Sequence, residues 1–197
     1  MPSQSVLPDG QYYTATEYLL ARYDILSRQM GFRARTLQEH RGWQTELRAQ
    51  LRRITGMDTM LSCALEPVVT ERVEMDGYVR ERVRIETEPG VIMPMHDFIP
   101  SDLTAGECRS AIIAPHGHGS GGKLSPAGRT DVPGVAGAIE KYNYDYGVQF
   151  VRQGFVAFCP DARGFGERRE WPLQGEATDL MLSSSCEVLN HMAIPLG

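Results

Sequence analysis

A glycine-rich stretch with two histidines, residues 110–123, contains the residues of this sequence that are best suited to chemistry. Its sequence is Ser-Ala-Ile-Ile-Ala-Pro-His-Gly-His-Gly-Ser-Gly-Gly-Lys. Glycines allow the backbone to turn tightly, so that its N–H groups stay unpaired and can face a ligand. Within His116-Gly117-His118-Gly119, the N–H of His118 could point at an oxygen that gains negative charge during acyl transfer. As Gly117-x-x-x-x-Gly122-Lys123, the same stretch could instead bind phosphate.

The phosphate interpretation requires Gly-x-x-x-x-Gly-Lys-[Ser/Thr] and a helix that begins at the lysine. Here Leu124 stands where a hydroxyl residue would bind Mg²⁺, and Ser125 comes one position late. Pro126 and Gly128 would break a helix that began at Lys123. We therefore disfavour the phosphate interpretation and expect no specific binding of ATP or GTP. An oxyanion turn and an ordinary glycine turn both remain open from this stretch alone.

A serine nucleophile on a strand-to-helix turn would need the motif Gly-x-Ser-x-Gly, which the sequence lacks. The nearest imitation surrounds Ser120, but it begins with histidine and no helix follows it at once. Residues 183–185 are serines within a predicted helix. His96-Asp97 is not expected to be a catalytic pair, because neighbouring strand residues point to opposite faces. His191 has no visible acid partner. The sequence thus has a candidate oxyanion turn but no recognisable set of nucleophile, acid and catalytic histidine.

Alternating apolar and helical segments surround this loop. Residues 111–114 form a short apolar strand, a long glycine-rich loop follows, and residues 139–153 have helical periodicity. Residues 155–159 are apolar without alternation, as in a parallel strand that is buried on both faces. Residues 176–190 predict a further helix. This order predicts that the two strands are adjacent and parallel, with a right-handed helical crossover.

Antiparallel strands are predicted before the loop, in residues 68–87, where Asp76-Gly77 is a strong hairpin signal. A two-residue turn there gives two complementary charge pairs across the strands, Glu71 with Arg82 and Arg72 with Glu81. Residues 91–99 predict a third strand. Because Pro94 has no N–H, we expect that strand to lie at the sheet edge or to carry a bulge.

Two helices are predicted in residues 14–55, the second with one apolar stripe. Thr14-x-x-Glu17 and Thr36-x-x-Glu39 both fit the capping box that satisfies the first free N–H groups of a helix. The pattern changes at Pro67. We therefore divide the chain into a helical extension, residues 1–65, and an α/β part, residues 66–197.

Composition and charge argue against several classes of function. The chain has 197 residues, 42% of them hydrophobic, and a net charge of −5, which argues against a nucleic-acid binder. The start of the chain lacks the pattern of a signal peptide, and no apolar run is long enough for a membrane span. The four cysteines form no Cys-x-x-Cys pair, so reduced thiols in the cytoplasm are expected. We expect no metal and no cofactor.

The segment from Tyr146 to Glu167 closely resembles the helix, fourth strand and Asp-x-Arg-Gly-x-Gly turn of α/β-hydrolases. Together with the His-Gly-His-Gly-x-Gly-Gly-Lys loop, it is similar to the dienelactone hydrolase and acetyl-xylan-esterase-like branch of that superfamily, over about residues 66–197. The resemblance implies an α/β fold with a mostly parallel, incomplete sheet that has antiparallel strands at one edge. It also implies that Asp161 and Arg163 shape a loop beside the active site.

The same resemblance implies a serine-esterase-like carboxylic-ester hydrolase that acts on a small-molecule ester. The oxyanion donor would be the backbone of His118, in a loop formed with His116, Gly117 and Gly119. In that superfamily the nucleophile, acid and histidine come later, so we expect this chain to be inactive alone and part of an esterase of roughly twice its length. The alternative is a non-catalytic, truncated module that binds a small molecule or a partner. The hydrolase strand order also implies that, without the fifth strand, the strand at 111–114 forms an open edge that allows self-association.

Overall fold

The computed structural model describes residues 14–27, 29–171, 174–175 and 182–193. Contacts divide the chain into two compact units, Met1–Thr55 and Gly56–Gly197, and we describe each by itself. None of the helices within the described ranges is long and apolar enough to cross a bilayer.

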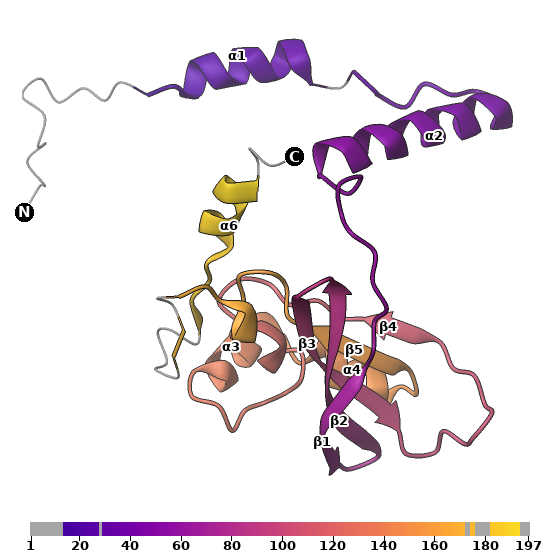
Figure 1. Cartoon of the computed structure of the whole chain (residues 1–197), viewed down its shortest axis with the longest axis vertical. Helices are drawn as coiled ribbons and strands as arrows, with labels where there is room; N and C mark the ends of the chain where they lie inside the picture. Colours follow the sequence, from indigo (N-terminus) through magenta and orange to yellow (C-terminus); the bar gives the residue numbers. More distant parts are fainter. Residues whose placement is uncertain (1–13, 28, 172–173, 176–181, 194–197) are drawn as a thin grey trace, which may run out of the picture. The chain divides into compact units, whose positions relative to one another are not determined.

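The first unit contains helices α1 (Thr16–Leu26) and α2 (Leu37–Ile54), joined by an extended segment (Figure 1). The capping box predicted at Thr36 is confirmed. Its hydroxyl accepts a hydrogen bond from the Glu39 N–H at 3.2 Å, and the Glu39 carboxylate accepts one from the Thr36 N–H at 3.1 Å. The box predicted at Thr14 does not form, because α1 begins one residue too late for it.

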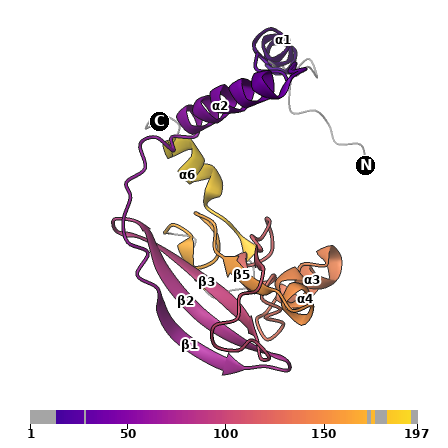
Figure 2. The ribbon, with the colours of Figure 1, turned by 90° about the vertical axis from the view of Figure 1, so that its right-hand side faces the viewer.

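The second unit is built on a five-stranded sheet with the order β1-β2-β3-β5-β4 (Figures 1 and 2). Its strands are β1 (Val68–Glu74), β2 (Tyr78–Glu88), β3 (Val91–Pro100), β4 (Ala111–Ile113) and β5 (Val156–Pro160). The hairpin register predicted from charge is confirmed, with Glu71 opposite Arg82 and Arg72 opposite Glu81.

The prediction of a mostly parallel sheet is wrong. Strands β1 and β2, β2 and β3, and β3 and β5 pair antiparallel, and only β4 and β5 are parallel among the described strands. Antiparallel neighbours can follow each other through short turns, whereas each parallel pair needs a long crossover. The described strands of this sheet have one helical crossover, between β4 and β5. The parallel pairing predicted for these two strands is confirmed, with Ile112 opposite Ala157.

Strand β3 is central, between β2 and β5, so the edge position predicted from Pro94 is wrong. The irregularity in the β2–β3 pairing lies between Glu86 and Glu88, away from the proline. One position beyond the pair of Met95 and Pro160, the Asp161 N–H donates to the Pro94 carbonyl at 3.0 Å. The return bond cannot form because proline has no N–H. The Asp161 carbonyl instead accepts a hydrogen bond from the Arg168 guanidinium at 3.0 Å.

The helix predicted over residues 139–153 is two helices, α3 (Val135–Tyr142) and α4 (Tyr146–Arg152). The break is at Asn143, whose φ of 54° is left-handed, a conformation that asparagine tolerates better than most residues. The Asn143 N–H caps α3 through the Ile139 carbonyl at 2.7 Å.

The last described helix, α6 (Cys186–Ala193), covers only the end of the helix predicted over 176–190. Residues 176–181 of that prediction lie outside the described residues. Ser183, Ser184 and Ser185 precede α6 and are not helical, contrary to the prediction.

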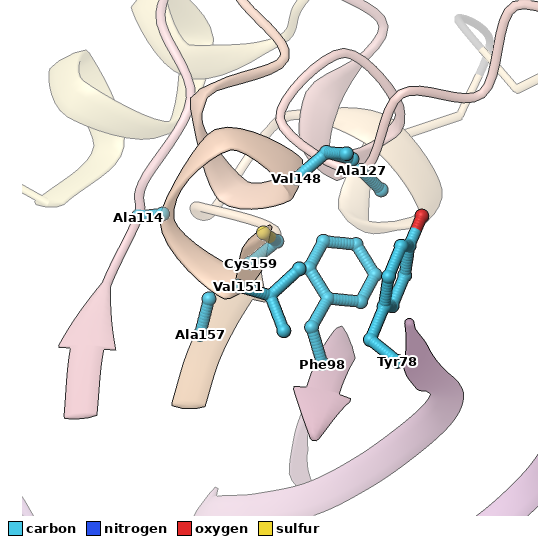
Figure 3. Close-up of a cluster of buried hydrophobic side chains, with 8 residues drawn as sticks. All are labelled: Tyr78, Phe98, Ala114, Ala127, Val148, Val151, Ala157 and Cys159. Atoms are coloured by element: carbon cyan, nitrogen blue, oxygen red, sulfur yellow. The ribbon is translucent and has the colours of Figure 1, made fainter. Parts of the chain in front are cut away.

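Helix α4 packs against β3 and β5 to form the core of the second unit. Figure 3 shows Val151 of this helix beside the ring of Phe98 and Val148 beside Ala127. The Phe98 ring lies edge-on to Tyr78 with 5.3 Å between ring centroids. A Cβ on Gly147 would lie only 2.6 Å from the Pro126 carbonyl, so glycine is required for this close packing. The buried cluster consists of Tyr78, Phe98, Ala114, Ala127, Val148, Val151, Ala157 and Cys159.

Candidate functional site

Two loops meet beyond the ends of β4 and β5. Because these strands are parallel, the segments that leave their carboxyl ends lie at the same edge of the sheet. The first loop carries the predicted oxyanion turn and the short 3-10 helix η1 (Gly122–Leu124). The second begins at Asp161 and contains the 3-10 helix η2 (Gly166–Arg168).

A buried ion pair joins the two loops. The side chains of Lys123 and Asp161 are 1% and 0% exposed, and Lys123 Nζ lies 2.6 Å from Asp161 Oδ2. Lys123 Nζ also forms an ion pair with Glu167, which in turn pairs with Arg82 on β2. A buried charge is tolerated only when it is paired and hydrogen-bonded, and here both ions are. The sequence did not reveal this pair, because 38 residues separate its members.

Asp161 also bonds to the backbone of both loops. Its carboxylate accepts hydrogen bonds from the Lys123 N–H at 2.7 Å and from the Glu167 N–H at 3.0 Å. Gly122 and Gly166 lie so close to this carboxylate that a Cβ on either would overlap Oδ1. The role in loop shape that the resemblance implied for Asp161 therefore agrees with its contacts. Arg163, the other residue in that prediction, pairs with Glu88 of β2.

His116 connects the oxyanion turn to the second loop. Its Nε2 accepts a hydrogen bond from the Ala162 N–H at 3.1 Å, and its Nδ1 lies 2.9 Å from the Gly117 carbonyl. Because Nε2 is the acceptor, the ring proton is on Nδ1, where it donates to that carbonyl. Burial lowers the pKa of His116, which favours this neutral form. Both ring nitrogens of His116 are thus used in contacts with the two loops.

The turn itself depends on two glycines for different reasons. A Cβ on Gly117 would lie 2.6 Å from Tyr144 Oη, so this position requires close approach. Gly119 has no such neighbour but has a φ of 67°, which favours glycine. Between them lies His118, whose N–H donates to no atom of the described residues. The predicted oxyanion donor therefore sits unpaired on a turn that the surrounding contacts hold in shape.

Ser120 is not placed to act as a nucleophile. It is 1% exposed, and its hydroxyl points inward to the Gly117 carbonyl at 2.8 Å. The structure also disfavours a phosphate loop at this position. The ammonium of Lys123 is buried and paired, and a 3-10 helix stands where a phosphate loop would need an α-helix.

The neighbouring residues His96 and Asp97 do not pair. Burial lowers the pKa of His96 to about 3, with the nearby positive charge of Lys123 as a further cause. Burial raises the pKa of Asp97 to about 7, with the Glu81 carboxylate as a further cause. His96 is therefore neutral above about pH 3, and Asp97 keeps its proton below about pH 7. Adjacent strand residues point to opposite faces, as the sequence predicted for this pair.

A cavity of about 530 Å³ adjoins the loop pair. Its lining combines residues of both loops, namely Gly121, Lys123, Leu124, Val132, Gly166, Glu167, Arg169 and Gly175. Three or more His, Cys, Asp or Glu side chains suited to a metal ion do not gather anywhere in the part of the chain that the structure describes.

No family model and no curated protein matches this chain. Among solved structures, it is similar to a Bacteroides fragilis protein assigned as an acetyl xylan esterase (BF1801), with a TM-score of 0.67 and 21% identity. It is also similar to methylesterase BT1017, with a TM-score of 0.50 and 22% identity. The matches cover 98% and 93% of this chain but only 47% and 38% of those chains. At this identity the likeness concerns the fold, and the chain has an esterase-like, mixed α/β fold.

Proposed function

We propose that this chain is the portion of a serine-type carboxylic-ester hydrolase that carries the oxyanion loop, in the dienelactone hydrolase and acetyl-xylan-esterase-like branch. Its ligand would be a small-molecule ester. In this proposal the His118 N–H donates to the carbonyl oxygen as it becomes negative, while His116, Gly117 and Gly119 shape the turn. The nucleophile, its acid and its histidine would come from outside residues 1–197.

The observation that carries the proposal is the unpaired N–H of His118 on a braced turn. An oxyanion donor must be pre-oriented, because reorganisation during the reaction would cost part of the stabilisation. Here Tyr144 limits one side of the turn, His116 bonds to the second loop, and the Lys123–Asp161 pair joins the two loops. These contacts provide the rigidity that such a donor needs.

The test compares residues 1–197 with a protein extended by the coding sequence that follows Gly197. We expect no catalytic turnover of p-nitrophenyl acetate by residues 1–197, because no nucleophile attacks the ester. An in-frame Gly-x-Ser-x-Gly segment in the extension should bring turnover. Catalytic turnover by residues 1–197 that Ser120→Ala abolishes would refute the proposal.

In the extended enzyme, two substitutions separate the donor from the side chain of His118. His118→Pro removes the N–H, whereas His118→Ala removes the imidazole and keeps the N–H. We expect the proline variant to have a kcat about 10²–10³ lower than the alanine variant, provided both melt as cooperatively as the parent. Equal kcat values for the two variants would show that the His118 N–H is not the oxyanion donor. A stop codon directly after Gly197, with no turnover, would favour the non-catalytic binding module.

A further inference from the structure

A thiol and an imidazole from distant segments meet beside the candidate oxyanion turn. Cys186 Sγ lies 3.2 Å from Nε2 of His118, and Ser184 Oγ lies 3.3 Å from the same sulfur. The thiol is free and partly accessible, and the imidazole is exposed. The proposed ester hydrolysis uses the backbone of His118 but neither this ring nor Cys186.

Several contacts hold the backbone at Cys186 against the loop that follows β5. The Ser185 N–H donates to the Gly164 carbonyl at 2.8 Å, and the Ser185 hydroxyl accepts from the Glu170 N–H at 2.9 Å. Gly164 has a φ of 79°, and a Cβ there would lie 2.7 Å from the Cys186 nitrogen. The start of α6 is therefore packed directly on the loop that follows β5.

The imidazole is held by the same loop. The rings of His118 and Phe165 meet edge to face with 4.8 Å between their centroids. Phe165 is 8% exposed, so it provides a fixed surface for His118. Cys186 and His118 thus both contact the segment around Gly164 and Phe165. This shared segment keeps the thiol and the imidazole close together.

We propose that Cys186 is a reactive thiol for soft carbon electrophiles, with His118 as its base. In the reaction the Sγ–H proton passes to Nε2 of His118, and the sulfur electron pair forms a bond to carbon. The leaving group departs with the electron pair of the bond that breaks. A thiolate is the nucleophilic form of cysteine, and a base within hydrogen-bond reach generates it. The inference does not rest on the proposed ester hydrolysis.

The first test uses iodoacetamide and maps the label on each cysteine by peptide mass spectrometry. Cys108 is the internal reference, because it is exposed and makes no contact with an imidazole of the described residues. We expect Cys186 to be carboxamidomethylated at least about tenfold faster than Cys108, although Cys186 is less accessible. Equal or slower labelling of Cys186 would overturn the proposal.

The second test removes the base. His118→Asn should slow labelling of Cys186 about tenfold, whereas His191→Asn, which changes an exposed histidine of α6, should leave its rate unchanged. An unchanged rate in His118→Asn would overturn the role of His118. Cys159 is buried, so its protection shows that each variant is folded. If His118→Asn exposes Cys159, that variant is misfolded. The labelling rates of Cys186 and Cys108 in the parent chain then decide whether Cys186 is a reactive thiol.

Discussion

Lys123 buries a full positive charge that Asp161 and Glu167 balance. Lys123→Ala would leave the fully buried Asp161 carboxylate without its counter-ion, and we expect a loss of about 3–5 kcal/mol in the free energy of unfolding. Urea denaturation measures it. Lys141, the other lysine of the chain, is exposed and lies over the ring of Tyr142, so Lys141→Ala should cost less than about 1 kcal/mol. Similar losses in both variants would show that the ion pair contributes little.

The protonation of Asp97 makes stability depend on pH. Burial raises its pKa to about 7, whereas in the unfolded chain it is near the ordinary value of 3.8. The folded state thus keeps a proton that the unfolded state releases, so this group's contribution to stability falls as the pH rises from about 4 to 7. The amide in Asp97→Asn does not titrate. We therefore expect its stability relative to the parent to rise by about 1–2 kcal/mol from pH 4.5 to 8, a value reduced for partial solvation.

Thermal or urea unfolding of both proteins across that pH range tests the prediction. His96, whose pKa is lowered to about 3, contributes stability that is lost as the pH falls from about 6.5 toward 3. That effect is present in both proteins, so it cancels in their difference. A difference that does not vary with pH would mean that Asp97 is ionised in the folded state.

Single residues were predictable from sequence where their role is local. The turn glycines and the unpaired His118 N–H follow from the His-Gly-His-Gly pattern, and the Thr36 capping box follows from a four-residue motif. The Lys123–Asp161 pair was not predictable, because it depends on how two loops pack. The edge position predicted from Pro94 was wrong for the same reason. The distant Arg168 donates to the Asp161 carbonyl, the hydrogen bond that an N–H at position 94 would otherwise make.

The contact between the two loops depends on the absence of a side chain at Gly122. Its φ is 66°, and a Cβ would overlap Asp161 Oδ1 and lie 2.7 Å from Gly166 Cα. Gly122→Ala should therefore cost about 2–4 kcal/mol through backbone strain and overpacking. Gly137 in α3 has open space around it, so Gly137→Ala should stabilise by about 0.5–1 kcal/mol through helix propensity.

Differential scanning calorimetry of both alanine variants checks the prediction through the sign of the change in Tm. A decrease is expected for Gly122→Ala and an increase for Gly137→Ala. Changes of the same sign and size would mean that the loops separate easily and that Gly122 can move away from Asp161.

The elements themselves were predicted with uneven success. The β1–β2 register followed from charges within one hairpin, and the parallel β4–β5 pair followed from the strand–helix–strand order. The antiparallel pairing of β3 with β5 brings together segments about 60 residues apart in sequence, and no local pattern specifies its direction. The break at Asn143 was missed because apolar periodicity continues across it.

At the scale of the second unit, β4 lies at the edge of the sheet and pairs only with β5 among the described strands. The Ala114 N–H donates to the Phe158 carbonyl of β5. Because successive N–H groups of a strand point to opposite sides, the N–H of Ile113 points to the open edge. The side chain of Ile113 is 72% exposed. We expect residues 1–197 to self-associate through this edge at micromolar concentrations. Ile113→Pro, which removes the outward N–H, should return the chain to a monomer.

Sedimentation velocity across a concentration series tests this expectation. Ile113→Ala is the matched control, because it removes apolar surface but keeps the N–H. If the alanine substitution abolishes association as fully as the proline substitution does, the contact is hydrophobic burial rather than strand pairing. A monomer at all concentrations in the parent chain would contradict the prediction.

The hydrogen bond from Arg168 to the Asp161 carbonyl makes two distant positions dependent on each other. Strand β3 lacks one rung of its ladder at Pro94, and a side chain 74 residues later in the sequence occupies the vacant acceptor. A residue with an N–H at position 94 would compete with Arg168 for that acceptor, so the arginine would become dispensable. We therefore expect proline at position 94 and arginine at position 168 to occur together, and to be lost together, among related sequences. This dependence could not be inferred from either position considered alone.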